Sequence, residues 1–323
     1  MNEPGGGAVA VDMTTPQYHP SGKPKQFIEL TSPVGHKIAG FVLANSLCQV
    51  CHGLPIPRRD HGPTTLPVCG CDIPTQYPVV QADTAKGKDL ILCGSGPSLP
   101  KVKNLLKVHP EVDVWGCNDA LMWLTRRGLK VTHGVGIDQS PDLYTTCWTA
   151  PPPVQYLIAS SASHQLFAHL IRYGHRHRIT LFHSFIGFEG EEGLYRLLYQ
   201  PAPMVGSGLN VVNRSIPLAV FLGYQTIYLV GADCALGHRD RMHAGETAAE
   251  TGIILRGKID GQRWATKPDM LASACDLVRQ KREMGERLQF IGDTLPRALQ
   301  DKDDAFLDRC ISWRAPTPEA GSP

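Results

Sequence analysis

The stretch DLILCGSGPSL, residues 89–99, decides how the rest of the chain is interpreted. Its first half is a short apolar run, which is typical of a strand buried on both faces of a sheet. Its second half holds two glycines and a proline, and a helix-like segment continues to residue 108. This order predicts a strand, a tight turn and a helix, which is the repeating unit of parallel α/β proteins.

The same alternation of short apolar runs with helix-like segments continues toward the C-terminus. Further short apolar runs occupy residues 112–117, 131–138, 155–160, 179–183, 226–233 and 288–291. Helix-like segments lie between most of them, among them residues 119–127, 208–222 and 268–284. We therefore expect an α/β fold with a mostly parallel sheet and helices on both faces.

Composition limits the classes of protein to which the chain can belong. Hydrophobic residues make up 42% of the 323 residues, which is enough for a large core. A net charge of +2 disfavours general coating of nucleic acid. The longest candidate for a membrane span, residues 216–223, falls far short of the ~18 apolar residues required. The N-terminus does not resemble a secretory signal, and six scattered cysteines are expected to be reduced core thiols, so we expect a cytoplasmic protein.

Four segments are expected along the chain. Residues 1–25 and 313–323 are rich in Gly, Pro or Thr without periodicity, and we expect both to be disordered tails. Residues 26–84 carry clustered cysteines and many prolines, which indicates a small, loop-rich unit. Residues 85–312 form the large α/β domain.

The small unit contains two close cysteine pairs, formed by Cys48, Cys51, Cys69 and Cys71. Paired thiolates suit tetrahedral Zn²⁺, and the intervening loop is long enough to fold back. His52 or His61 could replace one thiol. Four protein ligands would make this zinc structural, while free thiols or a disulfide remain the alternative.

The turn after the first strand is a candidate phosphate-binding loop, made of Gly94, Ser95, Gly96, Pro97 and Ser98. The glycines let a ligand approach the backbone, and the following helix start favours an anion. Leu99 stands where a dinucleotide-binding fingerprint has its third glycine, and Gly-Lys-Ser/Thr occurs nowhere in the chain. The alternative is an ordinary Gly-Pro turn that caps a helix.

Polar side chains follow three more of the expected strands. They are Asn118, Asp138 and Asp233. Asn118 could contact a base or ribose. The two aspartates could hold Mg²⁺ beside phosphates or could orient an acceptor hydroxyl, and we count Asp233 among the candidate catalytic residues. Ser207 and Gly208 form a second small-residue helix start that could receive an anion. Singly, these residues could equally be helix caps, turn formers or packing positions.

The loop after Asp233 carries two histidines, His238 and His243, together with arginines and acids. A histidine beside a strand-end aspartate can donate or accept a proton near neutral pH. The alternative is a solvated surface loop.

Taken in order, these segments resemble the 6-hydroxymethylpterin diphosphokinase MptE-like family, which is related to motility accessory factor glycosyltransferases and Rossmann-like sialyltransferases. The resemblance spans about residues 88–308. The segments that carry it are 94–99, Cys117-Asn118, 128–138, 222–233 and His243-Ala244. The chain departs from the family pattern at Ser95 and Ala232.

The resemblance implies a Rossmann-like domain that transfers a group from a nucleotide. It places nucleotide contacts on residues 94–98 and Asn118, and an acid or base on His243. We expect a glycosyltransferase that uses a nucleotide-sugar donor and an unknown acceptor. One alternative is an ATP- and Mg²⁺-dependent diphosphotransferase acting on a hydroxymethylpterin-like alcohol, and the other is a non-catalytic, zinc-containing interaction protein.

Overall fold

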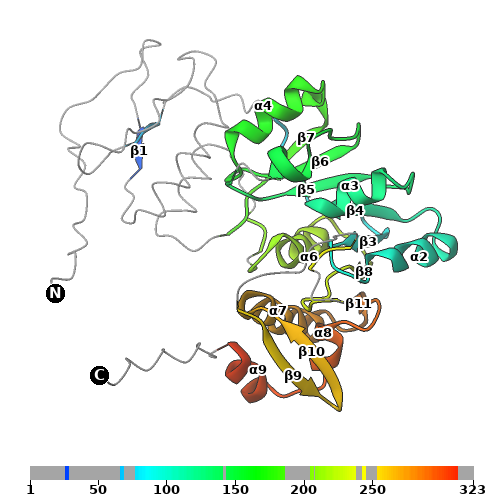
Figure 1. The fold of residues 1–323 in the computed structure, drawn as a ribbon. Coiled ribbons are helices and arrows are strands. Elements are labelled where there is room, and N and C mark those ends of the chain that lie inside the picture. The colour runs from blue at the N-terminus through cyan, green and yellow to red at the C-terminus, as the bar shows by residue number, and fades with distance from the viewer. Residues whose placement is uncertain are drawn as a thin grey trace, which may run out of the picture. The chain divides into compact units, whose positions relative to one another are not determined.

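The structure is a computed structural model that describes residues 26–28, 66–68, 77–140, 143–185, 204–206, 208–237, 242–244 and 253–311. The chain divides into two compact units (Figure 1). The first contains residues 1–82 and 133–207, and the second contains residues 83–132 and 208–323. The large domain expected over residues 85–312 is therefore shared between the two units, which are described separately here.

Four described strands of the second unit form a parallel sheet in the order β11-β8-β3-β4. Strand β3 lies in the middle, where Ile91 pairs with Val114 of β4 on one side and Tyr228 of β8 on the other. The bounds of these strands are β3 Asp89–Cys93, β4 Asp113–Cys117, β8 Thr226–Val230 and β11 Leu288–Phe290.

The helices expected in this unit are present, with somewhat shorter bounds than the sequence indicates. The bounds are η1 Leu99–Lys101, α2 Val102–Val108, α3 Asp119–Thr125, α6 Val211–Phe221, α7 Pro268–Met284, η5 Gly285–Arg287, α8 Leu295–Leu299 and α9 Asp304–Ile311. Of these, α8 and α9 were not singled out in the sequence.

Helices cover both faces of this sheet, because successive residues of a strand point to opposite sides. At the end of β4, a Cβ on Gly116 would lie 2.6 Å from the Cα of Leu121 in α3. The next residue, Cys117, points the other way, with its Sγ 3.6 Å from the Ser215 hydroxyl of α6. The expected arrangement of helices on both faces is therefore confirmed for this unit.

Helix α6 contains a proline whose missing N–H is compensated from α7. Pro217 cannot donate to the carbonyl of Asn213, four residues earlier. Gln280 of α7 instead donates to that carbonyl at 3.3 Å. The Asn213 side chain in turn donates to the carbonyl of Ser273 at 3.2 Å and to the carboxylate of Asp276 at 2.5 Å. These bonds connect α6 to α7.

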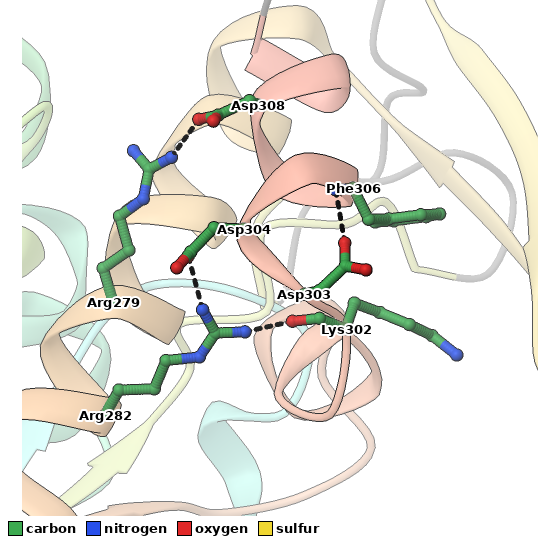
Figure 2. Close-up of polar contacts among 7 residues, drawn as sticks. All are labelled: Arg279, Arg282, Lys302, Asp303, Asp304, Phe306 and Asp308. Carbon is green, nitrogen blue, oxygen red and sulfur yellow. Dashed lines mark hydrogen bonds and ion pairs between the residues drawn. The ribbon is translucent and has the colours of Figure 1, made fainter.

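Helix α9 is attached to α7 by two arginine–aspartate ion pairs, which Figure 2 shows. Arg279 contacts Asp308 at 2.6 Å, and Arg282 contacts Asp304 at 2.5 Å. Arg282 also donates to the carbonyl of Lys302 just before the helix. Because these pairs are solvent-exposed, each contributes at most about 1 kcal/mol.

A two-stranded antiparallel hairpin precedes α7 and was not expected from the sequence. Its strands are β9 Leu255–Ile259 and β10 Gln262–Thr266. The turn residues Asp260 and Gly261 have φ angles of +50° and +83°. Asp-Gly between strands is a strong hairpin signal, because this turn needs positive φ at both positions.

The first unit contains the other three parallel strands, in the order β5-β6-β7. They and the unit's other elements have the bounds β5 His133–Gly136, β6 Gln155–Ala159, β7 Ile179–Phe182, η2 Leu143–Cys147, α4 His164–Arg172 and η3 Arg176–Arg178. Strands β1 Gln26–Ile28 and β2 Leu66–Val68 form a separate antiparallel pair. All seven apolar runs predicted as strands are thus confirmed.

None of the helices in the described part of the chain combines the length and apolar character needed to cross a lipid bilayer.

His183, at the end of β7, is fully buried and lies 2.9 Å from the Ser160 hydroxyl through its Nδ1. Burial lowers the pKa of His183 from its ordinary value of 6.5 to about 4. The folded protein therefore keeps this ring neutral at a pH where the unfolded chain takes up a proton.

We predict that His183 makes the first unit sensitive to mild acid. Between pH 6.5 and about 4 only the unfolded chain binds this proton, so the free energy of unfolding should fall by about 1.4 kcal/mol per pH unit. Urea unfolding of the wild type and His183→Asn should be compared at pH about 7 and about 5. The wild type should lose roughly 2 kcal/mol more than the variant over this interval. Equal losses in the two proteins would contradict the prediction.

Candidate functional site

A cavity of about 320 Å³ lies at the carboxyl ends of β3, β4 and β8, within the second unit. The chain proceeds from β3 to β4 on one side and later returns to β8 on the other, so the strand order reverses between β3 and β8. Ligands of open α/β sheets bind outside the carboxyl ends of the strands at such a reversal. The lining brings together six residues that were predicted from the sequence, namely Gly94, Ser95, Gly96, Asn118, Asp233 and His243.

The loops that follow β3 and β8 contact each other directly through their backbones. The amide of Gly94 donates to the carbonyl of Val230 at 2.8 Å, and that of Gly96 donates to the carbonyl of Gly231 at 2.7 Å. A Cβ on Gly94 would overlap the Gly231 carbonyl, and a Cβ on Gly231 would overlap that of Gly94. Gly231 also has a φ of +70°, which glycine adopts without strain. Glycine is therefore required on both sides of this contact.

A buried carboxylate connects the two loops. Oδ2 of Asp233 accepts the backbone amide of Ser98 at 3.0 Å and the Ser98 hydroxyl at 2.9 Å. The same hydroxyl oxygen accepts the amide of Gly231 at 3.1 Å. Burial raises the pKa of Asp233, while the bonds from Ser98 and the charge of Lys101 act in the opposite direction. Asp233 lines the cavity, but one of its oxygens holds the two loops together.

These hydrogen bonds limit which N–H and hydroxyl groups of the glycine loop a ligand could contact. The amides of Gly94, Gly96, Ser98 and Leu99 already donate to acceptors within the fold. Pro97 has no N–H, and the Ser98 hydroxyl donates its hydrogen to Asp233 rather than into the cavity. Among the described acceptors, none takes the amide of Ser95. Ser95 is therefore the residue through which the loop can present an N–H to an anion.

Asn118 occupies a strained position between β4 and α3. Its φ of +46° and ψ of −123° lie in a region that residues with a Cβ rarely adopt. The strain follows from packing: α3 begins directly after β4, and its Leu121 lies against Gly116 of that strand. The turn leaves Asn118 on the lining of the cavity. Strain of about 1–3 kcal/mol at a cavity is typical of functional sites.

His243 and its neighbour Ala244 each make one hydrogen bond to Ser95 of the glycine loop. Nδ1 of His243 lies 2.6 Å from the Ser95 hydroxyl oxygen, and the amide of Ala244 donates to the Ser95 carbonyl at 2.7 Å. Ser95 and His243 are 148 positions apart in the chain. Both Ser95 and His243 line the cavity. The lining of the cavity thus contains an imidazole that is hydrogen-bonded to the glycine loop.

The start of α6 contributes a residue that was not singled out in the sequence. Asn210 caps the helix, because its Oδ1 accepts the amides of Val212 at 2.9 Å and Asn213 at 3.0 Å. Asn210 also lines the cavity. An asparagine directly before an apolar helical run is a recognised start signal that could have identified it. At Gly208, a Cβ would lie 2.8 Å from the Cβ of Asn213, which favours a packing role for this glycine.

The remaining predicted residues are not among the described lining of the cavity. Asp138 follows β5 in the first unit, where its carbonyl accepts the amide of Ser163 at 3.1 Å. Several predictions fall outside the described residues: the tails 1–25 and 313–323, His238, Ser207, His52, His61 and the cysteines Cys48, Cys51, Cys69 and Cys71. The structural zinc site therefore stays a prediction. In the part of the chain that is described, no three His, Cys, Asp or Glu side chains come together to hold a metal ion.

The fold and the cavity define the class of protein. A parallel α/β sheet with glycine-containing loops and a cavity at the reversal of strand order is the architecture of Rossmann-like nucleotide-binding domains. The family model described as 6-hydroxymethylpterin diphosphokinase MptE-like matches residues 73–239, more than half of the chain. The chain belongs to the MptE-like family, as the sequence resemblance implied.

Among solved structures, the chain is similar to the MAf glycosyltransferase from Magnetospirillum magneticum AMB-1. The TM-score is 0.52 at 12% sequence identity, with 85% of this chain and 41% of that protein covered. At this identity the similarity concerns the fold alone, and this chain spans less than half the length of that protein. The comparison with curated proteins gives no match.

We predict that the contact between the two loops tolerates no side chain. Gly231→Ala should lower the free energy of unfolding by about 2–4 kcal/mol, because its Cβ would overlap the Gly94 carbonyl in an already left-handed backbone. Denaturant unfolding measures this loss. Gly261→Ala is the control, since that glycine also has positive φ but its Cβ would meet open space. Similar losses in both variants would show that backbone conformation, not the contact, explains the effect.

Proposed function

We propose that this protein is a nucleotide-dependent transferase whose cavity binds the nucleotide part of a donor. The observation that carries the proposal is the position of the cavity at the reversal of strand order, where the ends of β3, β4 and β8 converge. Its volume of about 320 Å³ falls within the range of roughly 300–1,000 Å³ for small-molecule sites. Membership of the MptE-like family supports a transferase.

The chemical character of the lining suits a nucleoside. Ser95, Asn118 and Asn210 supply polar groups to the lining, and Met242 and Met270 supply apolar surface. A nucleoside combines a flat base with a ribose that carries hydroxyl groups. We assign base or ribose contacts to Asn118 and a phosphate contact to the backbone of Ser95.

The transferred group that we favour is a sugar. The fold is shared with a glycosyltransferase, although at an identity that shows fold alone. In such a transfer, the bond between the sugar and the donor phosphate breaks and its electron pair stays on the phosphate oxygen. The acceptor hydroxyl loses its proton as its oxygen bonds to the sugar. We assign the handling of that proton to His243, the imidazole that lines the cavity.

The second candidate is a diphosphotransferase that acts on a pterin alcohol, the activity after which the family is named. That chemistry would require Mg²⁺ beside the phosphates of ATP. Mg²⁺ at such a site is held by one or two carboxylates together with the substrate phosphates, and Asp119 and Asp233 lie on the lining of the cavity. One oxygen of Asp233 already accepts two bonds from Ser98, and for this reason we rank the sugar transfer first.

A panel of ligands tests the proposal. Thermal unfolding of the full chain should be followed with nucleoside monophosphates, nucleotide-sugars and ATP, each with and without Mg²⁺. Binding at about 100 times Kd raises the free energy of unfolding by about 2.7 kcal/mol, which shifts the melting temperature by several degrees. Cleavage of a nucleotide-sugar would support sugar transfer. Release of AMP that requires both Mg²⁺ and a pterin alcohol would favour the second candidate. Absence of binding to every nucleotide would reject both and favour a non-catalytic interaction protein.

We predict that replacing Asn118 with glycine makes the protein more stable but weakens nucleotide binding. Asn118→Gly should raise the free energy of unfolding by about 1 kcal/mol, because glycine relieves the backbone strain. The same variant should weaken nucleotide binding about tenfold, because one hydrogen bond of roughly 1.4 kcal/mol is lost. Denaturant unfolding and calorimetry measure the two effects.

Asn118→Ala is the matched variant for this test. It removes the same amide but keeps a Cβ in the strained backbone, so it should lose binding without gaining stability. A dissociation constant unchanged in both variants would remove Asn118 from the binding site.

A further inference from the structure

We propose that Cys275 and Cys310 form a paired oxidation site, in which a peroxide converts the two thiols into a disulfide that joins α7 to α9. Both cysteines are free thiols in this structure, and neither is among the described residues that line the cavity. The sequence analysis treated them only as reduced core thiols. The inference does not depend on the proposed function.

The two thiols lie close enough to form a hydrogen bond. Cys275 is its donor and the sulfur of Cys310 is its acceptor. Cys275 is fully buried in α7, whereas Cys310 in α9 is partly exposed. A small oxidant that reaches the surface therefore meets Cys310 first, and the second thiol already lies beside it.

The packing of the two helices independently brings these cysteines together. The two arginine–aspartate pairs make α7 and α9 antiparallel, as Figure 2 shows for Arg279 and Asp308. Cys275 lies one turn before Arg279, on the same side of α7. Cys310 lies beyond Asp308 and three residues after Leu307, which is fully buried. The antiparallel register therefore places Cys310 opposite Cys275.

A disulfide requires a closer approach than a hydrogen bond, because its two sulfur atoms are only about 2.05 Å apart. Helix α9 can make this small movement at low cost, since the ion pairs that attach it to α7 are solvent-exposed and therefore weak. Cys93 and Cys117 are neighbouring buried thiols on the adjacent strands β3 and β4 and lack this freedom. They are the control pair within the same molecule.

The pKa values of the two thiols decide which of them reacts first. Burial raises the pKa of Cys275 to about 12. Burial also raises the pKa of Cys310, but the hydrogen bond from Cys275 and the charge of Arg309 act in the opposite direction. Cys310 therefore reaches the reactive thiolate form at a lower pH than Cys275. Because both thiols are protonated at neutral pH, the reaction should be slow at pH about 7 and faster above it.

The oxidation takes place in two steps. The Cys310 thiolate attacks one oxygen of hydrogen peroxide, the O–O bond breaks, and hydroxide leaves, so that Cys310 becomes a sulfenic acid. The sulfur of Cys275 then attacks the sulfur of Cys310 and loses its proton, the S–OH bond breaks, and water forms. In total, two thiols lose two electrons and one peroxide becomes two waters. A reducing compartment would keep the pair open until oxidant accumulates.

Peptide mapping of the full chain tests the link, since the chain has ten cysteines. The reduced protein is treated with hydrogen peroxide at pH about 8, and the remaining thiols are alkylated. The peptides that contain Cys275 and Cys310 should become linked, with the loss of two hydrogens, at least about tenfold faster than those of Cys93 and Cys117. Absence of this link, or equal rates for the two pairs, would overturn the proposal.

Two serine variants test the order of the steps. In Cys275→Ser the reaction should stop at a sulfenic acid on Cys310, which a sulfenic-acid reagent such as dimedone traps. In Cys310→Ser, Cys275 should remain a thiol under the same conditions. Trapping at Cys275 but not at Cys310 would contradict the order of attack.

Hydrogen exchange of the α9 amides measures the consequence of the link. Oxidation of the wild type should slow their exchange about tenfold or more, because a covalent bond to α7 opposes local opening. Oxidation of Cys310→Ser should leave the exchange unchanged, and the reduced forms of the two proteins should exchange alike. Equal exchange in oxidised and reduced wild type would show that the pair does not control the attachment of α9.

Discussion

The site depends on a contact between the ends of two parallel strands that lie far apart in the sequence. A buried carboxylate is costly unless it is hydrogen-bonded, and Asp233 meets this need with two donors from Ser98. The hydroxyl of Ser98 then accepts the amide of Gly231, so that a single serine bonds to both the backbone and the side chain of the opposite loop. Because Gly94 and Gly231 have no side chains, the two backbones approach closely enough for these bonds to form. As a result, the loops after β3 and β8 form one continuous edge, here called the rim, at the point where the strand order reverses.

This contact divides the polar residues of the rim into two groups. Ser98 and Asp233 use their hydrogen-bonding capacity mainly to hold the loops together. The second group consists of Ser95, Asn118 and His243, which line the cavity at positions set by the contact between the loops. The backbone strain at Asn118 is consistent with that division, since a strained residue persists only where its surroundings hold it in place.

The sequence predicted the strands well because each is a continuous apolar run that packing on both faces requires. It also predicted that polar residues after four of the strands would converge. Those that follow Cys93, Cys117 and Val230 line one cavity, whereas Asp138 belongs to the other unit. The hairpin at Asp260-Gly261 was missed although its turn signal is strong. A start signal in the sequence could have identified Asn210 as a helix cap, but nothing local shows that this residue also lines a cavity.

By itself, the sequence determined the class of the fold, the family and the set of candidate residues, because hydrophobic periodicity and short motifs are local properties of the chain. The tertiary structure decided which of the described candidates contact one another. Asp233 is bound to Ser98 across 135 residues, and His243 meets Ser95 across 148. Such pairings depend on how strands from distant parts of the chain order themselves in a sheet. Hydrogen bonds between side chains also depend on the final packing. Neighbouring donors compete for the same few acceptor atoms, and the packing decides which donor lies within reach.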